Sequence, residues 1–183
     1  MSSTRTIGAL TGVVRVSAAQ ADVRAARISD LDLLVELRLE YIRADLADLE
    51  AAGEAAITSQ LRTWIPANLG DRFFAELAFV DGRAAAVAML AVNEYPANPG
   101  FPNGRVGTVL NVWTRPAHRG QGLASALMRE LVAVGERLSL SKLELRSSAA
   151  ARPLYEGLGF VPSPDDHLPM ELSYRTRRPG ARI

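Results

Sequence analysis

The chain has 183 residues but no cysteine, and its only histidines are His118 and His167. Without cysteine, disulfide bonds and thiolate metal sites are excluded. Two histidines are too few for a zinc site unless carboxylates complete it, so we expect no metal. A chain without cysteine is also compatible with a reducing compartment, and we expect a cytoplasmic location.

An excess of charge of one sign is lacking as well. The chain has 21 Lys+Arg and 20 Asp+Glu, which leaves a formal net charge of +1. This balance provides no overall attraction to nucleic acid or to an anionic membrane, and only the short basic end of the chain, 176–183, stands out. We therefore expect a protein that binds no nucleic acid, and any site for an anion must be local.

Long apolar runs are the third absence. No stretch reaches the ~20 apolar residues of a membrane span. Gly8, Gly12 and Arg15 interrupt the start of the chain, where a signal peptide would have a continuous apolar segment, so we expect no membrane partner. With 48% hydrophobic residues the chain can still build a sizeable core. This predicts one domain over 21–175, between a flexible tail, 1–20, and the basic tail.

The order of apolar and turn residues predicts a mixed α/β fold of the α+β type. Apolar residues at helical spacing predict four helices, over 30–49, 57–69, 123–138 and 149–159. Gly53 interrupts the pattern between the first two helices. Alternating or β-rich segments bounded by turn residues predict seven strands, over 22–28, 73–80, 84–94, 106–114, 142–146, 160–161 and 169–174. Asp81-Gly82 is the most specific turn, because an Asp-Gly pair between two apolar runs is typical of a β-hairpin.

The segment RPAHRGQGLAS, 115–125, places two glycines and an arginine directly before the third predicted helix. The N-terminus of a helix carries backbone N–H groups without intrahelical partners and the positive end of the helix dipole, so it attracts anions. Glycine lets that backbone approach a phosphate closely. Gly120 and Gly122, with the cation of Arg119 beside them, can therefore hold a pyrophosphate. Taken alone, the glycines favour a plain strand-to-helix turn that binds nothing.

Two other phosphate-binding motifs fit poorly or not at all. GQGLAS, 120–125, partly matches Gly-x-Gly-x-x-Gly, and Glu144 follows about 20 residues on. In a dinucleotide-binding fold, however, the glycines follow their strand directly, whereas RPAHR intervenes here, and only about 60 residues remain for the rest of a doubly wound sheet. A Walker A loop is excluded because the chain contains no Gly-Lys-Ser or Gly-Lys-Thr.

A family resemblance decides between these alternatives. NVWTRPAHRGQGLASALMRELV, followed by KLELR and ARPLYEGLGF, resembles the acetyl-CoA-binding core of the GCN5-related N-acetyltransferase (GNAT) superfamily. The signature Gln/Arg-x-x-Gly-x-Gly/Ala is matched by Arg119, Gly122 and Ala124. A second signature, at the end of the family's fourth helix, is matched by Tyr155, Glu156, Gly159 and Phe160. The likeness is strongest over 106–161.

This resemblance implies the GNAT fold, in which a mixed, mostly antiparallel sheet of six to seven strands is flanked by about four helices and its fourth and fifth strands splay apart. It also implies acetyl-CoA as cosubstrate. The backbone N–H groups implied for its pyrophosphate are those of Arg119, Gly120, Gly122, Leu123 and Ala124. The positions implied for its pantetheine arm, between the splayed strands, are Val112 and Thr114. Dimers are common among relatives, so a homodimer is left open.

The resemblance extends to the chemistry of the site. Acyl transfer from a thioester needs a neutral amine, stabilisation of the developing oxyanion and a proton for the leaving thiolate. A backbone N–H near Val112 is implied for the oxyanion. Tyr155 is implied for the proton, since a phenol with a pKa near ~10 is mostly protonated at neutral pH. Without the resemblance, Tyr155 would be interpreted as a packed aromatic side chain.

Two candidate residues carry less support. Ser148 stands where many relatives have an asparagine that contacts the cofactor, and a hydroxyl can keep one hydrogen bond but not the paired donor and acceptor of an amide. Glu94, at the end of a predicted strand, is the first candidate for the general base. A solvated charge is the competing interpretation of Glu94. The remaining polar groups, for which structural or solvated roles are favoured, are His118, Asp165, Asp166 and His167.

We therefore expect an acetyl-CoA-dependent N-acetyltransferase that acts on a primary amine of a small-molecule or peptide acceptor, by direct attack on the thioester. The rival interpretation is a non-catalytic acyl-CoA-binding or sensing module of the same fold, which would have no need of Tyr155. We expect the acceptor pocket between the helices of 30–69 and the loop 95–105. The aromatic residues available to line it are Tyr41, Trp64, Tyr95, Phe101 and Trp113.

Overall fold

The structure, a computed structural model, describes residues 14–16, 21–45 and 51–163. Three features expected from the sequence lie outside these ranges: the helix end at 46–49, the last strand at 169–174, and the polar cluster of Asp165, Asp166 and His167.

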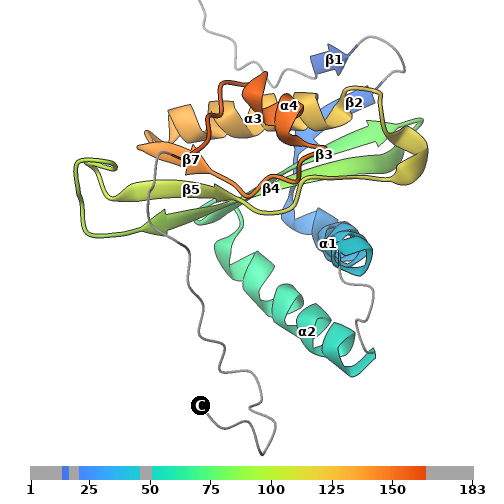
Figure 1. Ribbon diagram of the computed structural model, residues 1–183. Helices are drawn as coiled ribbons and strands as arrows, with labels where there is room; N and C mark the ends of the chain where they lie inside the picture. Colours follow the sequence, from blue (N-terminus) through green and yellow to red (C-terminus); the bar gives the residue numbers. More distant parts are fainter. Residues whose placement is uncertain (1–13, 17–20, 46–50, 164–183) are drawn as a thin grey trace, which may run out of the picture.

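A seven-stranded mixed sheet forms the centre of the described structure (Figure 1). Its strands are β1 (Val14–Val16), β2 (Ala21–Ala25), β3 (Phe73–Val80), β4 (Arg83–Glu94), β5 (Arg105–Val109), β6 (Trp113–Thr114) and β7 (Lys142–Glu144). Their order is β1-β2-β3-β4-β5-β7, and β6 pairs with β4. All neighbours are antiparallel except β5 and β7, which are parallel. The expected mixed, mostly antiparallel sheet is therefore confirmed.

The first strand lies inside the segment 1–20, for which the sequence predicts a flexible tail. Val14 pairs with Val23 and Val16 pairs with Ala21, so β1 adds an outer strand to β2. The structure differs from the prediction at these three residues. The other proposed limits of the domain stay a prediction.

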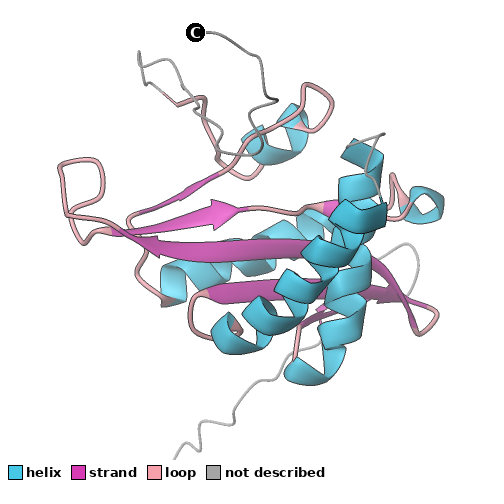
Figure 2. Cartoon of the chain, turned by 90° about the horizontal axis from the view of Figure 1, so that it is seen from below, coloured by secondary structure: helices cyan, strands magenta, loops and turns pink. Residues whose placement is uncertain are grey.

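Helices cover both faces of the sheet. They are α1 (Leu31–Asp45), α2 (Ala51–Asn68), α3 (Leu123–Arg137) and α4 (Arg152–Glu156), with short 3-10 helices η1 (Ile28–Asp30) and η2 (Pro116–His118). α3 and α4 lie on one face and α1 and α2 on the other (Figure 1), and the view from below shows the second pair lying across the strands (Figure 2). The core is divided accordingly: Leu127 and Leu131 of α3 pack in one apolar cluster, and Leu34 and Leu37 of α1 pack in the other.

The second helix begins earlier than the sequence predicts. α2 runs from Ala51 through Gly53 to Asn68, so the expected break at Gly53 is wrong. A glycine in a helix costs only about 1 kcal/mol relative to alanine. The start of α2 is also tied to α1, because the Arg43 Nε donates to the Glu54 carboxylate at 2.9 Å.

The predicted hairpin at Asp81-Gly82 is confirmed. Val80 pairs with Arg83 across the turn. Asp81 and Gly82 have φ angles of 50° and 74°, the two positive values that a type I′ turn requires. The turn aligns β3 and β4, the two long strands that carry the helices of both faces.

The strand predicted over 106–114 is interrupted by a β-bulge. Leu90 of β4 pairs with Val109, and Val87 pairs with Trp113. Two residues of β4 therefore face the three residues 110–112, which is one residue more than a regular ladder holds. Bulges of this kind redirect side chains and end pairing, and they are frequent beside active sites.

The strand predicted at Phe160-Val161 is wrong, because a helix cap occupies this position. Gly159, with a φ of 89°, follows α4 in the left-handed conformation. The Gly159 N–H donates to the Glu156 carbonyl and the Phe160 N–H donates to the Tyr155 carbonyl, each at 3.0 Å. This is the pattern of a Schellman cap. Phe160 is thereby turned back onto α4, and Val161 is 79% exposed.

Candidate active site

A cavity of about 180 Å³ opens where β5 and β7 stop pairing. The parallel ladder ends at Thr108 and Glu144. Beyond it β6 continues along β4, so the two strands separate as predicted. The cavity walls come from α1, the bulge, the segment after β7 and α4. They bring together three residues that the sequence assigned to cofactor binding and acid catalysis, namely Val112, Ser148 and Tyr155.

The glycine turn before α3 leaves an open backbone surface. Gly120 and Gly122 have φ angles of 74° and 76°, and a Cβ atom built at either position would meet nothing within 4 Å. The Ala126 N–H donates to the Gly122 carbonyl at 3.0 Å as the first bond of the helix ladder. The N–H groups of Leu123 and Ala124 therefore have no intrahelical acceptor. This backbone fits a pyrophosphate.

Arg119 takes part in the turn differently from what the sequence predicts. Its backbone N–H donates to the Pro116 carbonyl at 3.3 Å, within η2, so it is already engaged. Its guanidinium is held over β6. The Nε donates to the Thr114 carbonyl at 3.2 Å, and Cζ lies 5.0 Å from the Trp113 ring centroid. Arg119 therefore offers the turn a positioned cation rather than a free N–H group.

The edge of β6 provides unpaired backbone beside the cavity. The Arg115 N–H donates to the Ala85 carbonyl at 2.9 Å, toward β4. Successive residues of a strand direct their backbone groups to opposite sides, so the Thr114 N–H points away from β4, to the side where β7 has ended. Val112 lines the cavity at the bulge. Both positions agree with those implied for the pantetheine arm.

Tyr155 is buried in the wall of the cavity and is 8% exposed. Its ring packs edge to face on Phe160, with centroids 6.0 Å apart. Burial raises the pKa of the Tyr155 phenol above its ordinary value, and the nearby Tyr41 adds to this shift. A phenol with a raised pKa holds its proton at neutral pH and is therefore available as an acid.

Ser148 lines the cavity and contacts the first residues of α4. Its carbonyl accepts from the N–H groups of Ala151 and Arg152, each at 3.1 Å, and its Oγ accepts from the Ala151 N–H at 3.3 Å. The hydroxyl proton of Ser148 can still be donated into the cavity. One hydrogen bond of the kind expected from the family asparagine is thus available, and its use for the cofactor stays a prediction.

Glu94 is not brought together with Tyr155. It is an exposed residue at the end of β4, and it lies opposite Arg105 in the ladder between β4 and β5. The cavity begins four residues back along the strand, where Leu90 pairs with Val109, a separation of about 13 Å. The geometry gives no support to Glu94 as a base acting directly in this cavity.

The loop between β4 and β5 lies at the same distant end. Its Asn103 donates to the Ser139 carbonyl at 2.5 Å, and Arg105 donates to the Leu138 carbonyl at 2.7 Å. These contacts are at the C-terminal end of α3, whereas the glycine turn precedes its N-terminus; the 15 residues of α3 span about 22 Å. The β4–β5 loop and the glycine turn lie at opposite ends of the strands in Figure 1. The expectation that loop 95–105 borders the acceptor pocket therefore finds no support in this geometry.

Comparison with known proteins agrees with this geometry. The model of the acetyltransferase (GNAT) family matches residues 37–160. The chain belongs to this family. It is an N-acetyltransferase. A search of curated proteins finds no match.

Solved structures show the same GNAT fold. A predicted acetyltransferase from Clostridium acetobutylicum, crystallised with acetyl-CoA, is 24% identical, with 82% of this chain and 96% of that chain covered and a TM-score of 0.70. A GCN5-related N-acetyltransferase from Ralstonia eutropha JMP134 is 28% identical, with coverage of 82% and 98% and a TM-score of 0.68. A ribosomal-protein-alanine N-acetyltransferase from Brucella melitensis biovar Abortus 2308 is 21% identical, with coverage of 83% and 99% and a TM-score of 0.58.

Of the aromatic residues expected to line the acceptor pocket of this GNAT protein, Tyr41 lines the cavity. Trp113 packs edge to face on Tyr41, with centroids 6.3 Å apart. Trp64 instead packs on Phe73 in the core beneath α2. The other two candidates, Tyr95 and Phe101, pack on each other in the distant loop.

A group of polar contacts that the sequence did not indicate ties α1 to β6 and to Arg115, the residue after it. The Arg115 guanidinium donates to the carboxylates of Glu36 and Glu40 and to the Ala84 carbonyl, the last at 2.8 Å. Trp113 Nε1 donates to Glu40 at 3.0 Å. Burial opposes ionisation of Glu40, but the hydrogen bonds from Arg115 and Trp113 hold its pKa below the usual value. No sequence pattern joins these residues, because α1 and β6 are more than 70 residues apart.

Asp45 and Arg146 are two further charged residues of the cavity wall that the sequence analysis did not single out. Asp45 lies at the end of α1, one turn beyond Tyr41, and Arg146 follows β7. Their positions could be recognised only once α1 and β7 had been placed on the same opening of the sheet.

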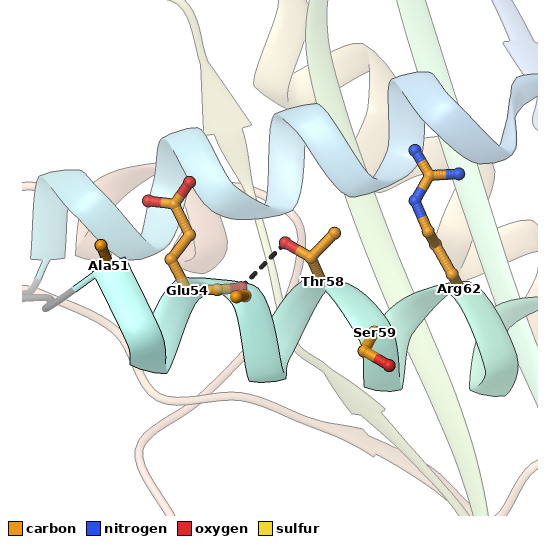
Figure 3. Close-up of a pocket in the computed structure, with 6 residues that line it drawn as sticks. Ala51, Glu54, Thr58, Ser59 and Arg62 are labelled. Atoms are coloured by element: carbon orange, nitrogen blue, oxygen red, sulfur yellow. Dashed lines mark hydrogen bonds between the residues drawn. The ribbon is translucent and has the colours of Figure 1, made fainter.

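A larger hollow of about 540 Å³ lies on α2, between Ala51 and Arg62 (Figure 3). Its polar groups are satisfied locally, since Thr58 Oγ1 donates to the Glu54 carbonyl at 2.8 Å and Arg62 pairs with Asp32 at 2.7 Å. Among the described residues no cluster of His, Cys, Asp and Glu could hold a metal ion. None of the helices in the described ranges is long and apolar enough to span a bilayer.

Proposed function

We propose that this GNAT enzyme uses acetyl-CoA as its donor and acetylates a primary amine of a small-molecule or peptide acceptor. The observation that carries the proposal is the cavity at the end of the β5–β7 ladder, whose wall contains Val112, Ser148 and Tyr155. The solved relative from Clostridium acetobutylicum, which contains acetyl-CoA, supports the same donor.

The glycine turn is the proposed phosphate site. The N–H groups of Gly120, Gly122, Leu123 and Ala124 would bind the pyrophosphate at the positive end of the α3 dipole. Arg119, fixed by Thr114 and Trp113, would add its charge from the side. The open space beside both glycines supports a close approach of this backbone to an anion.

The bulge and α4 are the proposed catalytic elements. Acetyl-CoA supplies an activated thioester, which the amine attacks directly. The backbone N–H near Val112 would stabilise the negative charge that develops on the carbonyl oxygen. Tyr155 would donate its phenolic proton to the departing sulfur. Transfer without an acetylated cysteine is consistent with the absence of cysteine from the chain.

The amine must also lose a proton. Glu94 is the residue to which the sequence points, but it lies about 13 Å along β4 from the edge of the cavity. Asp45 lines the cavity itself and is the carboxylate better placed to receive the proton, directly or through a water molecule.

The test is a thiol-release assay with acetyl-CoA and a panel of small amines, amino acids, aminoglycosides and peptides. We expect turnover with at least one primary amine and release of one thiol for each amine acetylated. Calorimetry with coenzyme A serves as the binding control. Tight binding of coenzyme A without turnover of any amine would instead support the acyl-CoA-binding or sensing module.

A further inference from the structure

Arg38 is a partly buried cation that faces the sheet from α1. Its Nη1 donates to Asn111 Oδ1 at 3.0 Å, and its Cζ lies 5.7 Å from the Tyr41 ring centroid. Burial lowers the pKa of the Arg38 guanidinium, although Tyr41 opposes the shift. Within the described ranges no carboxylate lies within 4.0 Å of Arg38, whereas Arg43 on the same helix pairs with Glu54. Arg38 thus bears a poorly hydrated charge that no carboxylate of the described residues neutralises.

Asn111 carries a second unmet donor at the same place. The residue is fully buried, at 0% exposure, and its Oδ1 is used by Arg38. Its Nδ2 has no hydrogen-bond partner in the part of the chain that the structure describes. A buried donor without an acceptor is costly and uncommon in folded proteins, so its retention indicates that something else supplies the acceptor.

Arg38 and Asn111 belong to two segments that border the cavity, α1 and the bulge. Asn111 is the middle residue of the bulge, and its neighbours Leu110 and Val112 line the cavity. Tyr41, on which Arg38 rests, lines the cavity from α1.

The pair lies on the face of the sheet opposite the glycine turn. Val112 packs with the apolar cluster beneath α3, whereas Trp113 packs with the cluster beneath α1. The hydrogen bond from Arg38 places Asn111 on the α1 side as well. Since the phosphate site precedes α3, this leaves the α1 side for the acceptor.

We propose that the acceptor amine carries an oxyanion, a carboxylate or a phosphate, which Arg38 and the Nδ2 of Asn111 bind together. This inference rests on the proposed function, because it assigns the acceptor of the same site. Arginine and an amide NH₂ group present only donors here, and the planar guanidinium matches the geometry of a carboxylate or phosphate. Asn111 acts in addition as a positioning residue, since its Oδ1 orients the guanidinium.

Two charged residues that line the cavity agree with an acceptor of mixed charge. Asp45 lies two turns beyond Arg38 on α1 and also lines the cavity, where it can attract the ammonium form of the acceptor. Arg146 lines the cavity too. Both Asp45 and Arg146 are exposed and therefore hydrated, so a ligand gains less from either of them than a bound anion gains from Arg38.

The test compares amines that differ only in the oxyanion. L-amino acids are assayed beside their carboxamides, and O-phosphoethanolamine is assayed beside ethanolamine, so that carboxylate and phosphate are distinguished. We expect the wild type to prefer one class of anionic amine by about 10- to 100-fold in kcat/KM, the loss typical of a charged hydrogen bond. In Arg38→Gln this ratio should fall to near one, because kcat/KM for the anionic amine drops toward that of its neutral partner.

A second variant tests the same anion site, and a third serves as its control. Asn111→Asp places a carboxylate where Oδ1 holds Arg38 and should abolish the preference in the same way, because the new charge neutralises the guanidinium. Arg43→Gln removes an equal charge from the same helix, at a residue paired with Glu54, and should leave the preference intact. If Asn111→Asp does not fold, the comparison of Arg38→Gln with the wild type still tests the preference for an oxyanion.

The outcomes separate this inference from the proposed function. Turnover of amines with no preference for an oxyanion, or a preference that survives Arg38→Gln, overturns the inference and leaves acetyl transfer standing. If no amine is turned over, calorimetry of the same amines on protein saturated with coenzyme A decides: binding that Arg38→Gln abolishes supports the anion site, and equal binding or none overturns it.

Discussion

Phe160 is joined to Tyr155 twice, once through the backbone and once through the rings. The Phe160 N–H donates to the Tyr155 carbonyl at 3.0 Å, and the two rings meet edge to face at a centroid distance of 6.0 Å. The turn at Gly159 makes both contacts possible by reversing the chain after α4. The second family motif therefore has a physical purpose, because it fixes the position of the proposed acid in a helix of only five residues.

Phe160→Ala should loosen this anchor. The partly buried ring packs on the α3-side core, so its loss should lower the free energy of unfolding by about 1–3 kcal/mol. Turnover should fall as well, because Tyr155 is no longer held in the cavity wall. Thermal unfolding and the thiol-release assay measure the two effects. Val161→Ala is the matched control: Val161 is 79% exposed, so the change should cost less than about 0.5 kcal/mol.

Tyr155→Phe should remove the acid and little else. We expect kcat to fall by roughly 10²-fold, the usual contribution of a positioned proton donor, with the affinity for coenzyme A unchanged. Since burial raises the pKa of Tyr155 above its ordinary value, ionisation of this group should lower the wild-type rate only at a higher pH than expected for a free phenol. Tyr95→Phe, at an exposed residue of the distant loop, is the control. Equal rates for Tyr155→Phe and wild type would remove Tyr155 from the mechanism.

Gly122→Glu should disrupt the phosphate site. The side chain forces a residue with a φ of 76° into an unfavourable conformation and places a carboxylate where the pyrophosphate is proposed to lie. The affinity for coenzyme A, measured by calorimetry, should fall at least about 10-fold. Gly70→Glu adds the same charge at a φ of 87°, also with nothing within 4 Å, after α2. A similar loss of affinity in both variants would trace the effect to stability and contradict the phosphate assignment.

Local patterns allowed much of this fold to be predicted. Asp81-Gly82 specifies its turn through two adjacent residues, and the apolar stripe of α3 repeats within a single helix, so neither depends on the rest of the chain. The glycine turn and Tyr155 were proposed in the same way, from short motifs. Of the residues proposed for the site, Val112, Ser148 and Tyr155 line one cavity, and their roles stay a prediction.

What the sequence did not reveal depends on contacts between distant segments. The bulge at 110–112 exists only relative to the uninterrupted β4, and the pairing of Arg38 with Asn111 joins residues 73 positions apart. The prediction for Phe160-Val161 was wrong because β propensity was outweighed by the cap at Gly159. Glu94 was chosen for its place at a strand end, but a strand has two ends and the sequence does not say which one faces the cofactor.

Glu94→Gln tests that choice directly. Because Glu94 is exposed and lies opposite Arg105 in the β4–β5 ladder, away from the cavity, we expect kcat and its dependence on pH to stay within about 2-fold of the wild type. Asp45→Asn, at the cavity wall, should instead lower kcat by at least about 10-fold. Both are measured as pH–rate profiles of thiol release. A tenfold loss confined to Glu94→Gln would restore Glu94 as the base and require the acceptor to enter from the distant loop.

Glu76 is a buried carboxyl group on the α3 face of β3 and is 6% exposed. Burial raises its pKa from 4.5 to about 7; the charge of Glu130 adds to the shift, and Arg137 opposes it. Below pH 4.5 the group is protonated in both the folded and the unfolded chain. Between pH 4.5 and 7 the unfolded chain ionises while the folded chain keeps the proton, so stability falls as the pH rises through this range and levels off above it.

Glu76→Gln should remove this dependence, because the amide keeps the size of the protonated acid and cannot ionise. The variant should be more stable than the wild type at pH 8 by about 1–3 kcal/mol, and the two should converge near pH 4.5. Denaturant unfolding at several pH values measures both quantities. Glu136→Gln removes an exposed glutamate of α3 and should leave the wild-type slope in place. A wild-type stability that does not change between pH 4.5 and 7 would mean that Glu76 is ionised in the folded protein, with a cation or water molecules reaching it beneath α3.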